Sequence, residues 1–141
     1  MNQNRPFKYR TWDPINKKMI YNTSIINGKP YNFNAYFANF YDRYIKDGII
    51  MEYIGLNDKN KKEICEGDII SAEVIKNSSE NLSKEVCQVI YNDNRTCYDI
   101  IGKGFRTYLW NAKTNIEIIV NIYENPELLE KNNVDNPTKI E

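Results

Sequence analysis

Residues 63–75, EICEGDIISAEVI, combine a turn with a strand and determine the fold expected for the C-terminal part of the chain. Gly67 stands between Glu66 and Asp68, and we expect it to take a backbone angle that other residues avoid. We expect the Asp68 side chain to accept hydrogen bonds from turn amides, as Asp commonly does in tight turns. The β-branched residues that follow favour a strand over residues 68–75.

Four more short strands are expected downstream of this one. Turn sequences rich in Gly, Asn and Ser separate them. The expected strands cover residues 84–91, 96–101, 105–110 and 116–123. Five short strands joined by tight turns are typical of a small antiparallel barrel.

The N-terminal third has a different pattern. Residues 7–12 alternate with the period of a strand, residues 13–16 form a turn, and residues 18–25 return as a second strand. Large apolar residues then recur at helical spacing over residues 33–45, and Gly48 provides a stop. These residues are Phe33, Tyr36, Phe37, Phe40, Tyr41, Tyr44 and Ile45. The pattern predicts an α+β fold, mostly β, with an N-terminal hairpin and helix packed beside the barrel.

Three segments are expected from these patterns. Residues 1–54 form the hairpin and helix subdomain, residues 55–130 form the barrel, and residues 131–141 form a polar, flexible tail.

Composition restricts the chemistry that the chain can perform. The 141 residues include no histidine and only three cysteines, none of them in CxxC spacing. This excludes Ser-His and Cys-His nucleophile pairs and disfavours most transition-metal sites. We therefore expect a protein that is not an enzyme and holds no metal or cofactor.

Two acidic stretches allow a functional alternative. Glu66 and Asp68 could act as an acid–base pair or as metal ligands, but their spacing around Gly67 favours a structural turn. Residues 57–60 offer oxygen ligands for calcium, but neighbouring lysines repel a cation and the downstream glutamate of a calcium loop is missing. A solvated turn is the expected state of this loop.

Cellular location is inferred from apolar patterning. No apolar run is long enough to span a bilayer, and no apolar stretch follows the basic residues at the N-terminus. We expect a cytoplasmic protein. The abundance of Asn, Ile, Lys and Tyr, whose codons are AT-rich, indicates a low-GC bacterium or its phage.

Charge is unevenly distributed along the chain. Residues 1–48 contain eight basic and three acidic residues, whereas residues 49–141 contain eleven basic and sixteen acidic ones. The predicted helix has an aromatic face wider than one core contact needs, which favours self-association through Phe33, Tyr36, Phe37, Phe40, Tyr41 and Tyr44. The alternative is that basic and aromatic residues together bind nucleic acid, with Lys8, Arg10, Lys17 and Lys18 as candidate contacts.

Three stretches resemble one known family. RPFKYRTWDPINKKM (5–19), IMEYIGLNDKNKKEICEGDII (50–70) and IVNIYENPELLE (119–130) are similar to the start, middle and end of the YopX family, small proteins of phages and prophages of low-GC bacteria. The resemblance implies an SH3-like barrel, offers no catalytic residues to carry over, and makes a phage or host macromolecule the expected partner.

Two positions depart from the family pattern. Lys61 stands where family members tend to have glycine, and Cys65 stands where they tend to have an aromatic residue. We expect the first to alter the turn at residues 58–60 and the second to alter the packing beneath residues 66–68.

Overall fold

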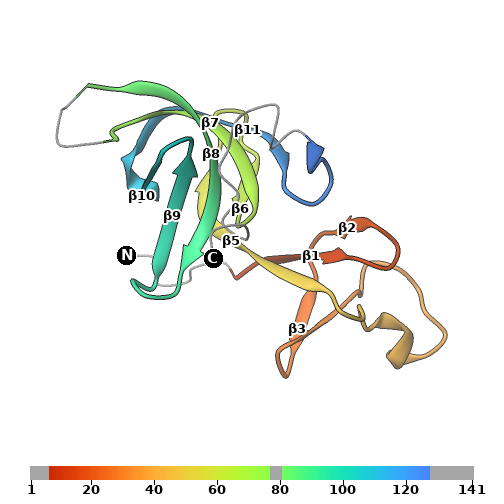
Figure 1. The fold of residues 1–141 in the computed structure, drawn as a ribbon. Helices are drawn as coiled ribbons and strands as arrows, with labels where there is room; N and C mark the ends of the chain where they lie inside the picture. Colours follow the sequence, from red (N-terminus) through yellow and green to blue (C-terminus); the bar gives the residue numbers. More distant parts are fainter. Residues whose placement is uncertain (1–6, 77–80, 128–141) are drawn as a thin grey trace, which may run out of the picture. The chain divides into compact units, whose positions relative to one another are not determined.

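The computed structural model describes residues 7–76 and 81–127 (Figure 1). The chain divides into two compact units, Met1–Gly55 and Leu56–Glu141. The described residues form short strands and two 3-10 helices, and the expected tail at residues 131–141 lies outside them.

The N-terminal unit is built around strand β1 (Tyr9–Asp13). It pairs antiparallel with β2 (Lys18–Ile20) on one side and with β5 (Ile49–Asn57) on the other. Within this unit the strand order is β2-β1-β5. Because β1 is a central strand, its polar residues are covered as well: Thr11 is fully buried, and its hydroxyl lies 2.9 Å from that of Thr23.

The second strand expected at residues 18–25 is divided in two. After β2 the chain bends at Asn22, which has a φ of +51°, and restarts as β3 (Ser24–Ile26). A two-residue turn then leads to β4 (Lys29–Tyr31). Asn27 and Gly28 both have positive φ, as the tight turn of a hairpin requires.

The predicted helix over residues 33–45 is wrong. The chain there forms a loop with one short 3-10 helix, η1 (Phe40–Arg43). The backbone N–H of Asn32 donates to the carbonyl oxygen of Arg43 at 2.8 Å. In an α-helix these two residues would lie about 16 Å apart, so the two geometries exclude each other. The α+β fold class, with a helix packed beside the barrel, is therefore corrected to an almost entirely β fold.

The C-terminal unit contains a five-stranded antiparallel sheet in the order β10-β9-β8-β7-β11. Strands β7 to β10 form a meander, and β11 returns to pair with β7 (Figure 1). Its elements are β6 (Glu63–Cys65), β7 (Asp68–Val74), β8 (Ser83–Asn92), β9 (Cys97–Gly102), β10 (Phe105–Tyr108), η2 (Leu109–Asn111) and β11 (Ala112–Asn121). The five strands expected from the sequence are all present, with boundaries shifted by up to four residues.

Strand register gathers the core of this unit on one face of the sheet. Ile70 lies opposite Cys87, and Val89 lies opposite Ile100; all four are fully buried. Ile69 faces the other way and packs against a second apolar group, formed by Val86, Val120 and Ile122. Residues on both faces of β7 are therefore buried, which explains why two apolar residues, Ile69 and Ile70, stand next to each other in this strand.

Candidate interaction surface of the N-terminal unit

The loop between β4 and β5 is closed at its base by backbone hydrogen bonds. Tyr31 and Tyr44 form an isolated antiparallel bridge. On one side of this bridge the backbone N–H of Asn32 donates to the carbonyl oxygen of Arg43. On the other side the backbone N–H of Ile45 donates to the carbonyl oxygen of Pro30 at 3.0 Å. The loop therefore projects from the hairpin as a defined element.

Arg43 organises the interior of this loop. Its Nη1 donates to the carbonyl oxygens of Asn32 at 3.2 Å and Ala35 at 3.0 Å. The guanidinium lies over the rings of Phe33 and Phe37, with its carbon 4.8 and 5.4 Å from the centroids. One cation thus fixes both the loop backbone and two aromatic rings.

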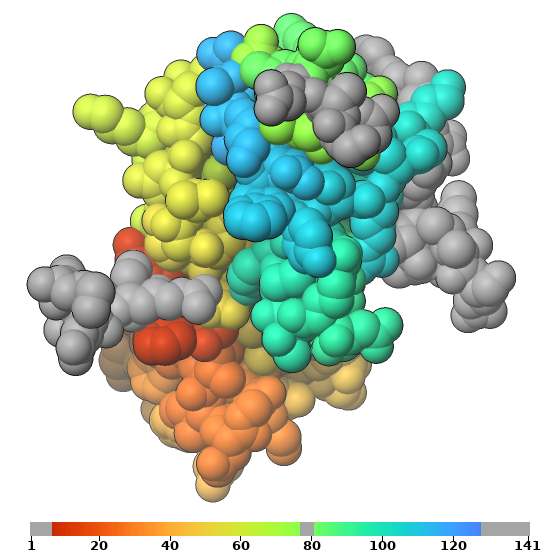
Figure 2. Space-filling model, turned by 90° about the vertical axis from the view of Figure 1, so that its left-hand side faces the viewer, coloured from red at the N-terminus to blue at the C-terminus, as the bar shows by residue number. Residues whose placement is uncertain are grey.

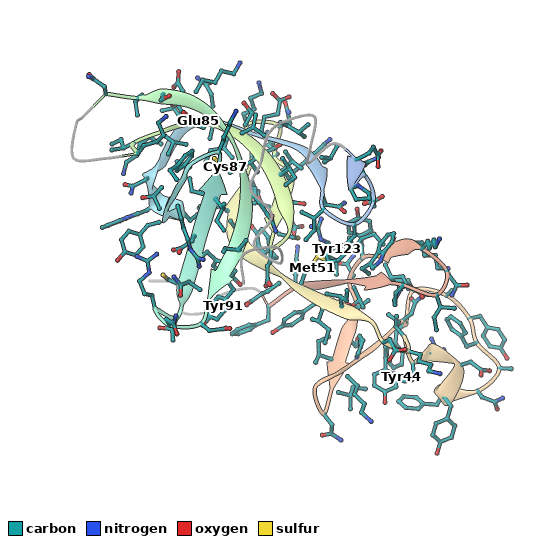
Figure 3. All side chains as sticks on the ribbon, in the orientation of Figure 1. Tyr44, Met51, Glu85, Cys87, Tyr91 and Tyr123 are labelled. Atoms are coloured by element: carbon teal, nitrogen blue, oxygen red, sulfur yellow. The ribbon has the colours of Figure 1, made fainter. Side chains whose placement is uncertain are left out.

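Seven aromatic residues lie between β4 and the end of this loop, and we call them the aromatic surface. They are Tyr31, Phe33, Tyr36, Phe37, Phe40, Tyr41 and Tyr44. Phe40 is their centre, since its ring lies 5.2 Å from Tyr31, 6.0 Å from Phe33 and 6.2 Å from Tyr41, measured between centroids. The ring centroid of Tyr44, which Figure 3 labels, lies 5.7 Å from the ring centroid of Tyr31.

The six residues expected from the sequence to form an interface all lie in this loop, although not on a helix. Tyr36 and Tyr41 are 91% and 85% exposed, and Phe33, Phe40 and Tyr44 are each at least 40% exposed. Tyr31 and Arg43 are not among the residues predicted from the sequence. A lone arginine within a run of aromatic residues is the signal that could have identified Arg43, because guanidinium groups stack on rings.

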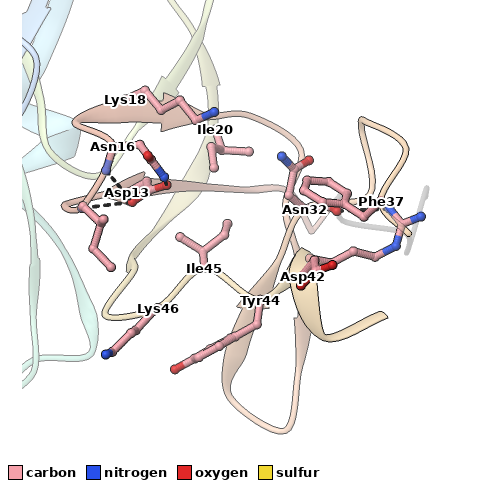
Figure 4. A pocket seen from close by; sticks show the side chains of 12 residues that line it. Asp13, Asn16, Lys18, Ile20, Asn32, Phe37, Asp42, Tyr44, Ile45 and Lys46 are labelled. Carbon is pink, nitrogen blue, oxygen red and sulfur yellow. Dashed lines mark hydrogen bonds between the residues drawn. The ribbon is translucent and has the colours of Figure 1, made fainter. Parts of the chain in front are cut away.

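A pocket of about 170 Å³ adjoins the aromatic surface (Figure 4). Phe37 and Tyr44 contribute to its wall together with charged residues from the first hairpin and from η1. Small-molecule sites usually measure about 300–1,000 Å³, so this pocket is smaller than a typical small-molecule site.

Of the two carboxylates that line this pocket, that of Asp13 has a structural role. Asp13 is buried and accepts the backbone N–H groups of Ile15 and Asn16, each at 3.0 Å, and the Asn16 side-chain amide at 2.8 Å. Burial raises the pKa of Asp13, but the hydrogen bonds from Asn16 and Ile15 outweigh it and leave the pKa below its usual value. An acceptor held ionised in this way is a poor general base.

The four basic residues considered for nucleic-acid contact do not form one exposed group. Lys8, Lys17 and Lys18 are exposed, whereas Arg10 is only 5% exposed. Arg10 lies on β1 opposite Met51 of β5, and its side chain is buried. Its burial argues against Arg10 as a nucleic-acid contact.

The turn at residues 66–68 belongs to the C-terminal unit. Gly67 has a φ of +88°, and Asp68 is buried with Oδ2 accepting the backbone N–H of Cys65 at 2.8 Å. The backbone N–H of Gly67 donates to the carbonyl oxygen of Val89 at 2.8 Å, and the carbonyl oxygen of Gly67 accepts the backbone N–H of Ile122 at 3.1 Å. This geometry links three chain segments, and Asp68 serves as a hydrogen-bond acceptor within the turn.

The loop at residues 57–60 exposes Asn57, Lys59 and Asn60, as expected of a solvated turn, but Asp58 is only 6% exposed. Its carboxylate accepts three backbone N–H groups, from Asn60 at 2.8 Å, Lys62 at 2.9 Å and Ile118 at 3.1 Å. Burial raises the pKa of Asp58, but these hydrogen bonds outweigh it, and the pKa lies below its usual value. Asp58 therefore ties this turn to β11.

The three cysteines are free thiols, and Cys65 and Cys87 are buried. Burial, with a smaller contribution from the charge of Glu85, raises the pKa of Cys87 to about 12, so its thiol stays protonated. Figure 3 labels Glu85 and Cys87, which both lie in β8. Within residues 7–76 and 81–127, no three His, Cys, Asp or Glu side chains gather as metal ligands would. No helix in these residues is long and apolar enough to cross a membrane.

The chain belongs to the YopX family, whose model, described as YopX protein, matches residues 8–130. This confirms the resemblance found in the three sequence stretches. No curated protein matches the chain.

One solved structure that resembles the chain is the crystal structure of protein EF1440 from Enterococcus faecalis. The two share 22% sequence identity with a TM-score of 0.53, over 89% of this chain and 99% of that chain. At this identity the likeness shows a shared fold.

Proposed function

We propose that this YopX-family chain is a non-catalytic accessory protein of a phage or prophage, which acts in the host cytoplasm. It self-associates through the aromatic surface and binds a further macromolecule. The observation that carries the proposal is the exposure of Tyr36 and Tyr41 beside a cluster of rings that Arg43 holds in place.

Exposed rings favour association because their burial removes a large apolar area from water. Aromatic residues and arginine are enriched at protein interfaces, where they supply much of the binding energy. Tyrosine is well suited to this role, since its hydroxyl remains hydrated or hydrogen-bonded at the rim of a contact. The pocket of Figure 4 offers space for one side chain next to the rings.

Charge supports a second copy of the chain as the occupant. The formal net charge is zero, so two copies do not repel each other at long range. The N-terminal segment has an excess of basic residues and the rest of the chain an excess of acidic ones. Opposite charges on two copies therefore attract, and salt weakens the attraction.

The alternative function, nucleic-acid binding by the N-terminal third, has less support. Of its four candidate contacts Arg10 is buried, and Lys8 lies with its Nζ 5.9 Å from the ring centroid of Tyr53. The remaining pair, Lys17 and Lys18, is too small for a basic patch.

Light-driven tyrosine cross-linking, followed by mass spectrometry of the joined peptides, tests where two copies meet. We expect a covalent dimer whose linked peptides contain Tyr36 or Tyr41. The variant Tyr36→Phe/Tyr41→Phe keeps the rings but removes the reactive hydroxyls, and we expect it to lower the yield strongly.

Tyr91→Phe is the matched control, since Tyr91 is a partly exposed tyrosine of the C-terminal unit and packs against Tyr98. It should leave the yield unchanged. Cross-linked dimers that form equally well from Tyr36→Phe/Tyr41→Phe would place the contact elsewhere and refute the proposal.

A further inference from the structure

The C-terminal unit has its own group of cationic and aromatic side chains, on neighbouring segments from β8 to β11. We call this group the cationic ledge. It consists of Arg95 in the β8–β9 turn, Arg106 and Tyr108 on β10, Trp110 in η2, and Lys113 at the start of β11. Figure 2 shows the segments from β9 to β11, coloured teal to blue, side by side on the face toward the viewer.

A buried carboxylate fixes the two arginines of the ledge. Asp99 on β9 is fully buried, and its Oδ2 accepts Nη2 of Arg95 at 2.6 Å and Nε of Arg106 at 2.8 Å. Asn92 donates to the same oxygen at 2.9 Å. The side chains of both arginines remain about two-fifths exposed, so the anchored guanidinium groups still reach solvent.

The rings of the ledge continue from these arginines. The guanidinium carbon of Arg95 lies 4.3 Å from the ring centroid of Tyr108. Tyr108 meets Trp110 edge to face, at 5.9 Å and 86°, and Nζ of Lys113 lies 5.7 Å from the Trp110 ring. Trp110 is nevertheless 71% exposed, so much of its indole remains open to solvent.

The charge of the ledge is opposite to that of the segment that carries it. Three cations and the carboxylate of Asp99 leave two positive charges, whereas residues 49–141 as a whole contain more acidic than basic residues. The ledge is therefore a local positive site, complementary to a ligand with spaced negative charges.

We propose that the cationic ledge binds single-stranded nucleic acid, with a base stacked on Trp110 and backbone phosphates contacted by Arg95, Arg106 and Lys113. Open aromatic rings next to fixed cations are the features by which proteins hold single strands without reading sequence. An acidic peptide would use the cations but would leave the open indole without a flat partner. The site is separate from the aromatic surface of the N-terminal unit and does not depend on self-association.

Fluorescence titration tests the proposal directly. The chain has two tryptophans, so the variant Trp12→Phe leaves Trp110 as the only tryptophan reporter. We expect oligo(dT) and oligo(U) of about twelve nucleotides to quench Trp110 emission, with an affinity that falls as salt rises. Poly-glutamate, an acidic polymer without bases, should not quench it. If both oligonucleotides leave the emission unchanged up to about 100 µM at low salt, the proposal is refuted.

Anisotropy of labelled oligo(dT) with substituted proteins separates the two kinds of contact. Trp110→Ala should weaken binding by about tenfold or more, because one stacked base contributes roughly that factor. Lys113→Gln should lower the slope of log affinity against log salt by about one. Both positions are on the surface, and Arg95 and Arg106 are left in place because Asp99 needs them.

Two controls complete the test. Lys103→Gln changes an exposed lysine in the β9–β10 turn, away from the ledge residues, and should keep the salt slope. Tyr36→Ser/Tyr41→Ser should keep the affinity for oligo(dT) even if it abolishes self-association. Equal affinity of Trp110→Ala and the unsubstituted protein would contradict the proposal, and so would equally tight binding of poly-glutamate.

Discussion

The carboxylate of Asp58 accepts the backbone N–H of Ile118, sixty residues further along the chain, at 3.1 Å. The same side chain closes its own turn by accepting from Asn60 and Lys62. A local turn and a distant strand of the C-terminal unit are thus joined by one buried charged group. The stability of this unit therefore depends on the Asp58 carboxylate.

Replacement of Asp58 by asparagine should destabilise the C-terminal unit. The substituted side chain would keep one acceptor oxygen, but its amide N–H₂ group would face a backbone donor. We expect Asp58→Asn to lower the free energy of unfolding by about 2 kcal/mol or more, since hydrogen bonds to a buried charged acceptor are strong. Urea unfolding monitored by circular dichroism measures the loss. The control Asp93→Asn changes an exposed turn residue and should leave the free energy of unfolding almost unchanged. Equal unfolding free energies for the two variants would refute the role of Asp58.

The pH dependence of stability follows from Asp13, Asp58 and Asp99, whose pKa values all lie below normal. For each, burial raises the pKa, and donated hydrogen bonds lower it by more. The unfolded chain therefore binds more protons near pH 4, so the stabilisation is present above the unfolded pKa and is lost as pH falls through the folded pKa. We expect unfolding free energy to decline below about pH 4, and to decline less in Asp58→Asn. An unchanged decline in that variant would contradict the assignment.

Lys61 is predicted to be a strained position. Its φ is +66°, in the left-handed region where a side chain is unfavourable, and its N–H donates to the carbonyl oxygen of Asp58 at 3.0 Å. We expect Lys61→Gly to stabilise the protein by about 0.5–1 kcal/mol. The neighbouring Lys62→Gly, where φ is not positive, should destabilise it, and a loss of stability in both variants would show that the Lys61 backbone is unstrained.

Gly67 should tolerate side chains poorly. At a φ of +88° a β-branched residue is strained, so Gly67→Val should cost about 1–3 kcal/mol of unfolding free energy. Gly67→Asn should cost less, because asparagine enters the left-handed region more readily. Thermal melting of the two variants compares them, and a normal melting temperature for Gly67→Val would show that this turn does not depend on glycine.

The sequence was informative where the pattern is local and repeated. The strands from Asp68 to Asn121 were predictable because β-branched residues alternate between turns rich in Gly, Asn and Ser. The helix at residues 33–45 was predicted wrongly because aromatic residues at three- and four-residue spacing also suit a loop whose ends are joined. What decides between the two is the contact of Arg43 with Asn32 and Ala35, which spacing does not reveal.

Burial of charged groups was the other feature that spacing did not reveal. The alternation of residues 7–12 predicts a strand but does not show that Arg10 is buried within it. Asp58 and Asp99 are buried because distant segments supply their donors, Ile118 in one case and Arg106 in the other. These pairings depend on the register of the sheet, which the sequence does not specify by itself.

Self-association through the aromatic surface is the central claim, and sedimentation equilibrium tests it most directly. The monomer has a mass of 16.7 kDa. We predict that the average mass of the unsubstituted protein rises above this value as concentration increases, and that Tyr36→Ser/Tyr41→Ser shifts the rise to much higher concentration while Tyr91→Ser does not. A mass that stays at the monomer value for the unsubstituted protein up to about 100 µM, a concentration at which even weak interfaces are populated, would contradict the account.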